Sequence, residues 1–225
     1  MPIENSIEGS VSSVLDTWLS YENVFINDAF FLPIQYNLYI PTEQLNNPIT
    51  CLVSHPQCLA QCQNYLQANY PDAIHIPSSS SSGSLLMLDA LKKEHQGIGI
   101  IGNSKLNQFN QLSCLKEQIE DQKENKTLFG LLSTSHTKND THTFTSLVFS
   151  TAANKPGSLQ DALSVFSKKE INLSRIISRP TKKQFGNYVF FIDIQATNNQ
   201  KDLKEALVDL QKRSSFYRVL GSYTL

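Results

Sequence analysis

Apolar and polar residues alternate with two different periods between residue 1 and about residue 135. An apolar stripe at helical spacing predicts a first helix, and its members are Val11, Val14, Leu15, Trp18 and Leu19. Apolar runs that predict strands follow at 24–40, 49–53, 73–77, 97–101 and 127–133. Pro33 predicts an edge or a bend within the first run. Strands that alternate with helices predict an α/β fold, with a parallel or mixed sheet covered on both faces.

The second half of the chain has a more explicit order of elements. The segments "FTSLVFSTA", "INLSRIISRP", "YVFFIDIQA" and "FYRVLGSYTL" predict four strands, with turns at "KPGS" and "KKQFGN". Two amphipathic helices lie between them, with apolar faces formed by Leu159, Ala162, Leu163 and Phe166 and by Leu203, Ala206, Leu207 and Leu210. This order predicts a ferredoxin-like βαββαβ domain.

Two polar stretches are candidate linkers. Ser133–Thr143 is short of apolar residues and predicts the boundary between domains at 1–135 and 143–225. The serine run Ser78–Ser82 has the composition of a linker. We interpret it as a strand-to-helix turn because apolar residues flank it closely on both sides.

Composition and charge exclude several classes of function. The 225 residues are 40% hydrophobic with a net charge of −1, which is typical of a globular protein without a basic footprint for nucleic acid. The sequence shows no secretory signal that would predict export. It also shows no run of about 20 apolar residues that would predict a membrane span. The four cysteines lack metal-site spacing, so we expect buried free thiols in the reducing cytoplasm and no metal.

Several segments together resemble a known family in the family's own order. "PIENSIEGSV", "SHPQCLAQC" and "ENKTLF" resemble motifs of prephenate dehydratase, and "PGSLQDALSVFSKKEINLSRIISRP" with "GNYVFFIDI" resembles its ACT regulatory domain. The resemblance implies a two-lobed catalytic domain like the periplasmic binding proteins, followed by the ACT domain. It further implies conversion of prephenate to phenylpyruvate without a cofactor, feedback control by phenylalanine, and a homo-oligomer (dimer or tetramer).

The same resemblance implies that a complete catalytic domain begins several dozen residues earlier, with a strand and a Gly-Thr-Phe-Ser type turn. On this reading Pro2–Asn5 lies near the crossover between lobes, and most of lobe one is absent. We therefore expect exposed strand edges and apolar surface, with poor solubility or reliance on dimerisation.

Three predicted turn-to-helix junctions suit a dicarboxylate substrate: Asn5-Ser6, Ser54-His55 and Ser79–Ser82. Helix N-termini carry free N–H groups and partial positive charge, so they bind carboxylates. We expect the substrate to contact Glu4, Ser6, Ser54, Ser80 and Ser81. The alternative from spacing alone is helix capping, because Asn5-x-x-Glu8 and Ser54-x-x-Gln57 fit capping boxes.

The resemblance assigns catalysis to Asn5, Gln57 and Thr127, with Thr127 as hydrogen-bond donor to the leaving hydroxyl. Without the resemblance, Thr127 is interpreted as a structural residue of a strand, because it is β-branched. His55 is interpreted as a turn or capping residue, whereas His75, His95, His136 and His142 form no constellation. The family's Thr-Arg-Phe reads Thr127-Leu128-Phe129 here, and loss of an Arg that meets substrate predicts weaker binding.

The resemblance also implies an amino-acid site in the ACT domain, with the residues Gly157, Ser158, Leu159, Ser178, Arg179 and Pro180. Gly157 permits close backbone approach, and the helix that follows offers its N-terminus to a carboxylate. The family's Glu is Ile177, which removes one acceptor for a ligand ammonium. Ordinary turn chemistry, and a salt bridge or capping role for Arg179, are the alternatives.

Two other functions remain at this point. One is a catalytically inactive, phenylalanine-binding regulatory remnant, which Leu128 and the missing lobe favour. The other is a transport-type binding protein, which the lack of a signal sequence and the ACT resemblance disfavour.

Overall fold

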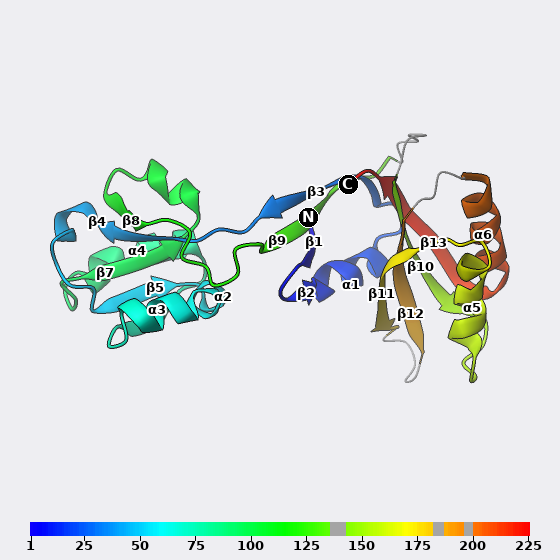
Figure 1. The fold of residues 1–225 in the computed structure, drawn as a ribbon, viewed down its shortest axis with the longest axis horizontal. Helices are drawn as coiled ribbons and strands as arrows, with labels where there is room; N and C mark the ends of the chain where they lie inside the picture. Colours follow the sequence, from blue (N-terminus) through cyan, green and yellow to red (C-terminus); the bar gives the residue numbers. More distant parts are fainter. Residues whose placement is uncertain (136–142, 182–186, 196–199) are drawn as a thin grey trace. The chain divides into compact units, whose positions relative to one another are not determined.

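The computed structural model describes residues 1–135, 143–181, 187–195 and 200–225. Two compact units form: unit 1 combines Met1–Leu32 with Thr127–Leu225, and unit 2 is Pro33–Lys126 (Figure 1). These units are defined by contacts between residues, whereas the predicted domains at 1–135 and 143–225 follow the order of motifs along the chain. The predicted domain boundaries therefore stay a prediction. His136, His142, most of the expected linker and the turn at 182–186 lie outside the described residues.

Unit 2 is built on a five-stranded mixed sheet in the order β6-β5-β7-β4-β8. Its strands are β4 (Asn37–Pro41), β5 (Cys51–Ser54), β6 (Ile74–Pro77), β7 (Ile98–Gly102) and β8 (Leu112–Lys116). Strand β5 pairs in parallel with β6 and β7, whereas β4 pairs antiparallel with β7 and β8. The predicted α/β alternation with a mixed sheet is confirmed.

Helices cover both faces of the unit 2 sheet. Neighbouring residues of a strand point to opposite faces, so apolar strands present side chains to helices on both sides. Leu38, Leu52 and Ile101 pack against α2 (Pro56–Gln61) and α3 (Gln63–Asn69). Tyr39, Val53 and Ile100 pack on the other side, where α4 (Ser81–Leu91) lies. Two short 3₁₀ helices, η1 (Thr42–Gln44) and η2 (Ser104–Gln108), complete the unit.

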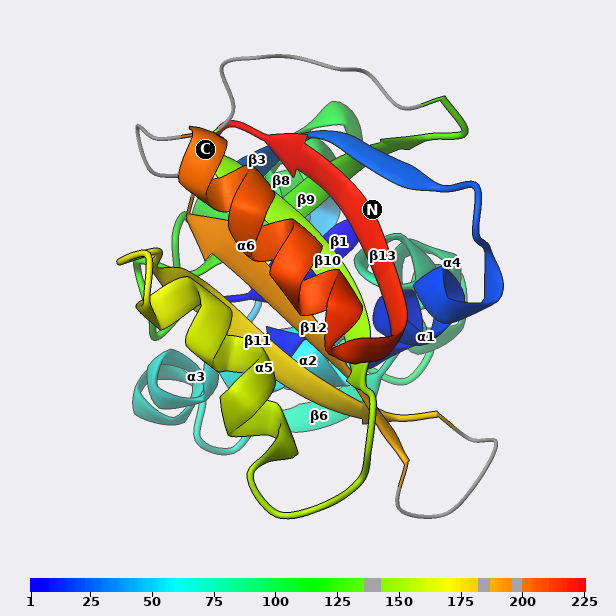
Figure 2. The ribbon, with the colours of Figure 1, turned by 90° about the vertical axis from the view of Figure 1, so that its right-hand side faces the viewer.

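The C-terminal part of unit 1 is the predicted βαββαβ domain. Its elements are β10 (Phe144–Thr151), α5 (Ser158–Ser167), β11 (Leu173–Pro180), β12 (Tyr188–Gln195), α6 (Gln200–Lys212) and β13 (Ser214–Tyr223). The strands form an antiparallel sheet in the order β11-β12-β10-β13. Helices α5 and α6 lie over one face of this sheet (Figure 2), and they share a buried core with it.

The N-terminal segment continues the same sheet beyond β13. Strands β3 (Phe25–Pro33), β9 (Lys126–Ser133), β1 (Pro2–Asn5) and β2 (Gly9–Ser10) follow in that order. The single parallel register between β13 and β3 joins Gly221 to Ile26. A Cβ at Gly221 would lie 2.0 Å from the Ile26 carbonyl oxygen, so glycine is needed for this approach.

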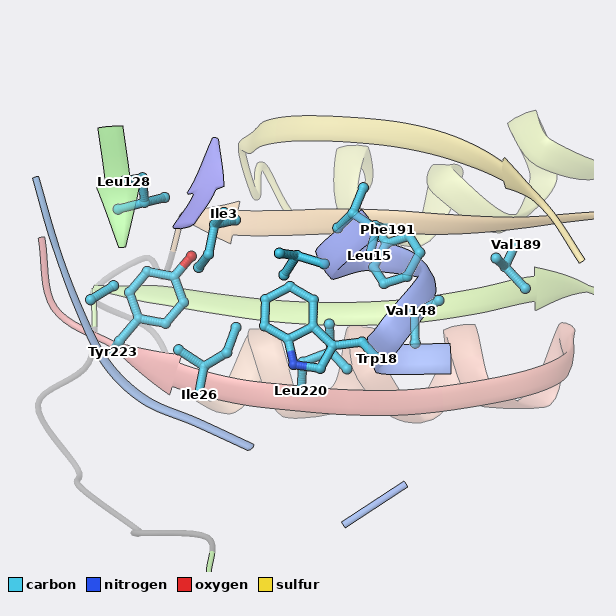
Figure 3. Close-up of a cluster of buried hydrophobic side chains, with 12 residues drawn as sticks. Ile3, Leu15, Trp18, Ile26, Leu128, Val148, Val189, Phe191, Leu220 and Tyr223 are labelled. Atoms are coloured by element: carbon cyan, nitrogen blue, oxygen red, sulfur yellow. The ribbon is translucent and has the colours of Figure 1, made fainter. Parts of the chain in front are cut away.

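Helix α1 (Ser12–Ser20) covers the face of the ACT strands opposite α5 and α6. Leu15 and Trp18 are almost fully buried there against Phe191 and Leu220 (Figure 3). The Arg218 guanidinium donates to the carbonyl oxygens of Trp18 and Tyr21, which satisfies acceptors at the end of the helix. The predicted first helix is therefore confirmed, and it is held by the ACT sheet.

Some details differ from the sequence predictions. The apolar run 24–40 forms two strands in different sheets, because Pro33 ends β3. The predicted helix after residue 54 is divided at Cys62, and strand β8 was not predicted. Cys51, Cys58 and Cys62 are buried free thiols as expected, but Cys114 is exposed because it lies on the edge strand β8. On β3, Phe30, Phe31 and Leu32 expose about half of their surface.

Candidate functional site

A buried hydrogen bond joins two of the three predicted catalytic residues. Strands β1 and β9 pair antiparallel with Asn5 opposite Thr127. The Asn5 side-chain Nδ2 donates to the Thr127 Oγ1 at 2.9 Å, and both residues are less than 10% exposed. The sheet register therefore brings together two residues that lie 122 positions apart in the chain.

The Asn5 amide has one orientation that satisfies its neighbours. Its Oδ1 accepts hydrogen bonds from the backbone N–H groups of Ile7 and Glu8, both at 3.0 Å. The amide nitrogen must then face Thr127, whose hydroxyl acts as acceptor in this bond. A threonine hydroxyl has two acceptor lone pairs and one donor proton. The bond with Asn5 thus leaves the Thr127 proton available for donation to a reacting group.

Glu4 and Leu128 form the adjacent pair on the same strands, and they point to the opposite side from Asn5 and Thr127. Leu128 is 5% exposed and belongs to the core between α1 and the sheet (Figure 3). Glu4 faces Arg175, with 3.9 Å between Glu4 Oε2 and Arg175 Nε. The Leu128 side chain thus packs in an apolar core rather than beside the Thr127 hydroxyl.

Gln57, the third predicted catalytic residue, belongs to unit 2. It lies in the first turn of α2 with an exposed side chain, and its backbone N–H donates to His55 Nδ1 at 3.2 Å. His55 is the N-cap, which confirms its interpretation as a capping residue. One turn later on α2, Gln61 Oε1 accepts from Asn125 Nδ2 at 3.0 Å.

The serine-rich junctions gather at one edge of the unit 2 sheet. Strands β5 and β6 are parallel, and Ser54 stands opposite Pro77 where both strands end. Ser80 is the N-cap of α4 and accepts the Gly83 N–H at 2.9 Å, while Ser81 is the first residue of that helix. The run Ser78–Ser82 is thus the predicted strand-to-helix turn. Ligands of open α/β sheets bind at such carboxyl ends of parallel strands.

Two of the predicted local roles are wrong. Asn5-Ser6 does not begin a helix, because Asn5 ends β1 and α1 begins at Ser12. The Ser54 side chain does not cap α2, because it is buried and donates to the Ile101 carbonyl oxygen at 2.7 Å. Spacing suggested both caps, but the hydrogen bonds of the neighbouring strands decided otherwise. Ser6 is exposed in the turn between β1 and β2.

The predicted ACT ligand residues divide between two places. Gly157 precedes α5 with a φ of 84°, a left-handed conformation that favours glycine. Ser158 Oγ is buried without a hydrogen-bond partner among the described residues. Leu159 lines a hollow of about 600 Å³, together with Leu163 and other residues of α5 and β11.

Ser178, Arg179 and Pro180 end the edge strand β11, on alternating sides. Ser178 and Pro180 are exposed, whereas Arg179 points toward α1. Its guanidinium donates to Asp16 Oδ1 at 3.0 and 2.8 Å and to Ser12 Oγ at 3.2 Å. The salt-bridge alternative for Arg179 is thus observed, and a ligand contact by this residue stays a prediction.

Sequence reasoning missed a buried polar cluster in unit 1. Asp193 accepts from Ser146 Oγ at 2.6 Å and from Arg175 Nε at 2.7 Å, and Ser146 Oγ lies 3.0 Å from Tyr223 Oη. Burial by itself lowers the pKa of Arg175. The charge of Asp193 and its hydrogen bond raise that pKa by more, so the net shift is upward. Burial, then the Asp193 charge, raise the pKa of Tyr223. The available signal was Asp193 within the apolar run "YVFFIDIQA".

The described residues contain neither a candidate metal site nor a candidate membrane-spanning helix. Within the described part of the chain, no group of three or more His, Cys, Asp or Glu residues is placed to hold a metal ion. None of the helices described is long and apolar enough to cross a lipid bilayer.

Two family models match the chain in succession. One is the prephenate dehydratase model over residues 1–137, and the other is the ACT domain model over residues 145–211. The fold and these matches define an α/β protein with a C-terminal ACT domain, as the strand order and motifs predicted. The chain belongs to the prephenate dehydratase family.

Individual relatives agree with this membership. The chain is 37% identical over 228 residues to a prephenate dehydratase from Methanocaldococcus jannaschii, covering 99% of this chain and 79% of the relative. It is 32% identical to a bifunctional chorismate mutase/prephenate dehydratase from Aquifex aeolicus, and it spans 60% of that protein's length. A solved prephenate dehydratase from Arthrobacter aurescens, in complex with L-Phe, superimposes with a TM-score of 0.87 at 29% identity. That match covers 100% of this chain and 74% of the solved one.

Proposed function

We propose that this protein converts prephenate to phenylpyruvate in phenylalanine biosynthesis, as a carbon–oxygen lyase without a cofactor. The carboxylate on the ring leaves as carbon dioxide, its bonding electrons enter the ring, and the ring hydroxyl departs as hydroxide, which takes one proton from the solvent to become water. Aromatisation favours this step, so the residues need mainly to orient the substrate and assist the leaving hydroxyl.

The hydrogen bond between Asn5 and Thr127 carries this proposal. Asn5 is fixed by two backbone N–H groups and orients Thr127 with its proton free to donate. A positioned neutral donor beside a departing hydroxyl stabilises the charge that develops on that oxygen. Thr127 is thus the donor, Asn5 orients it, and Gln57 supplies an exposed amide from α2.

Substrate carboxylates need hydrogen-bond donors, which the serine edge of unit 2 offers. Ser80 and Ser81 stand at the N-terminus of α4, an 11-residue helix whose first N–H groups and dipole favour an anion. Ser6 and Ser54 remain proposed contacts of prephenate, although Ser54 Oγ already donates to a carbonyl oxygen. Glu4 was also predicted as a contact, but its carboxylate faces Arg175, on the side of β1 opposite Asn5 and Thr127, and cannot donate to a substrate carboxylate.

The ACT domain is proposed to bind phenylalanine as an allosteric ligand, as in the A. aurescens complex with L-Phe. The apolar hollow beside Leu159 has a volume suited to an aromatic side chain, and Gly157 and Ser158 begin the adjoining helix. In the described sheet β11 is an edge strand, and it contributes to this hollow. Such an edge suits pairing with a second copy of the chain, which supports a homo-oligomer. We place the protein in the cytoplasm, where its free thiols stay reduced.

The test is to incubate the purified chain with prephenate at neutral pH and measure phenylpyruvate by its absorbance in alkali. The unaltered chain and Thr127→Ser, which keeps the hydroxyl, are expected to turn over, whereas Thr127→Val loses about 100-fold or more in kcat. Calorimetry with phenylalanine measures the ligand independently. Phenylalanine binding without any turnover of prephenate would refute the enzymatic proposal.

A further inference from the structure

Arg175 lies at the centre of the buried polar cluster on the face of the ACT sheet that α1 covers. Its side chain is 9% exposed, and Asp193 beside it is 5% exposed. Asp193 on β12 fixes Nε at 2.7 Å, and Ser146 on β10 in turn fixes Asp193. The direction of the guanidinium is therefore set by two neighbouring strands of the sheet.

One end of this guanidinium is not used by the cluster. Nη1 of Arg175 is buried and has no hydrogen-bond partner among the described residues. A buried donor without an acceptor is unfavourable. A second carboxylate, that of Glu4 on β1, lies 3.9 Å from Nε, beyond hydrogen-bond distance but within ion-pair distance. The Glu4 carboxylate is therefore the second negative charge beside this guanidinium, at ion-pair distance from Nε.

Glu4 is the residue directly before Asn5 on β1. Across the β1–β9 ladder, Glu4 stands opposite Leu128 and Asn5 opposite Thr127. A shift of the β1 backbone that moves Glu4 relative to Arg175 also moves the Asn5 amide relative to the Thr127 hydroxyl. The Asn5–Thr127 pair is thus connected to β11 of the ACT sheet through this ion pair, in addition to its connection through the continuous sheet.

We propose that Arg175 is a positioning residue for the dehydration. Its guanidinium holds Glu4, and through β1 it sets the alignment of Asn5 with Thr127. This inference rests on the proposed function. Arg175 also lies on β11, the strand that carries Ser178 and Pro180 on its other side, so one strand joins the predicted ligand residues to β1.

Two conservative variants of the whole chain test this role, with kcat and KM for prephenate as the measurements. Glu4→Gln keeps the shape but removes the charge. Arg175→Lys keeps a positive charge but loses the planar guanidinium whose Nε faces both Asp193 and Glu4. Each is expected to lower kcat about tenfold and to leave KM within twofold. The double variant is expected to be no worse than either single one, because both remove the same link.

Glu205→Gln is the matched control. It removes an exposed ion pair with Lys169 (2.6 Å) on the far face of the same unit, and it is expected to leave kcat and KM unchanged. Thermal melting followed by circular dichroism shows whether each variant is folded. Should Arg175→Lys fail to fold, Glu4→Gln alone decides, because Glu4 is partly exposed and its ion pair is the longer one.

Two results would overturn the positioning role while leaving the proposed function intact. One is unchanged kinetics in folded Glu4→Gln. The other is a raised KM with unchanged kcat, which would mean that Glu4 contacts the substrate directly. A lack of dehydratase activity in the unaltered chain would instead overturn the proposed function, and this inference with it.

Discussion

Replacing Asp193 by Asn tests how strongly the buried ion pair stabilises unit 1. The substitution preserves shape and the acceptor for Ser146, but it removes the charge that faces Arg175 at 2.7 Å. Breaking a buried pair by removing one partner typically costs about 3–5 kcal/mol, because the other charge stays buried. Glu4, 3.9 Å from Arg175, compensates in part, so we expect a loss of about 3 kcal/mol in the free energy of unfolding.

Urea unfolding followed by tryptophan fluorescence measures this loss in the right part of the molecule. Trp18 is the single tryptophan and is 2% exposed in the core of unit 1, so its emission reports that unit. With a slope of roughly 1.5–2 kcal/mol per M of urea, the midpoint is expected to fall by about 1.5–2 M. The double variant Asp193→Asn/Arg175→Met removes both charges and should recover more than half of the shift.

Exposed ion pairs contribute little to stability, so Glu205→Gln is expected to leave the midpoint where it is. A fall of less than about 0.5 M for Asp193→Asn would refute the reasoning, because it would correspond to less than about 1 kcal/mol. A double variant that is less stable than Asp193→Asn would also refute it. That result would mean that the Arg175 charge left buried in Asp193→Asn does not destabilise the protein.

Three further predictions follow from single positions. Gly157→Ala should lower the free energy of unfolding by about 1 kcal/mol, because an alanine there must adopt a φ of 84°. No atom lies within 4 Å of the added Cβ, so backbone strain is the only cost, and an unchanged melting temperature would contradict this. A thiol reagent should label Cys114 rapidly in the native chain and Cys51, Cys58 and Cys62 only after unfolding, and more than one fast thiol by mass spectrometry would count against the packing. Burial raises the pKa of Tyr217 to about 12. The neutral phenol therefore adds stability that is complete below pH about 10 and is lost as pH rises toward 12, so Tyr217→Phe should flatten the alkaline part of the stability curve.

Much of the fold follows from local patterns. The βαββαβ order in the second half was predicted because each of its elements has its own clear period and its own turn residues. The helix at 12–20 and the strand-to-helix turn at Ser78–Ser82 were predicted for the same reason. Periodicity is a property of neighbouring residues, and so it survives in the sequence.

Pairings between distant segments were not predicted. No pattern showed that "TLFGLLS" and the first residues pair with each other and extend the ACT sheet, or that Arg179 would meet Asp16 on α1. Asn5 was assigned a place at a helix start, whereas the structure places it at the end of a strand. The family motifs named Asn5 and Thr127 as functional residues, but the amide orientation that leaves the Thr127 proton free came from the hydrogen bonds.

The sequence alone therefore determined the class of protein, the order of its elements and the motif residues, because these depend on local periodicity and on recognisable short segments. Tertiary structure alone decided which of those residues meet. It also decided that a charged pair, Arg175 and Asp193, lies buried behind β1. An Arg in one strand and an Asp in another give no sequence pattern that predicts their contact. The order of strands in the sheet places them side by side, and burial then makes their interaction strong.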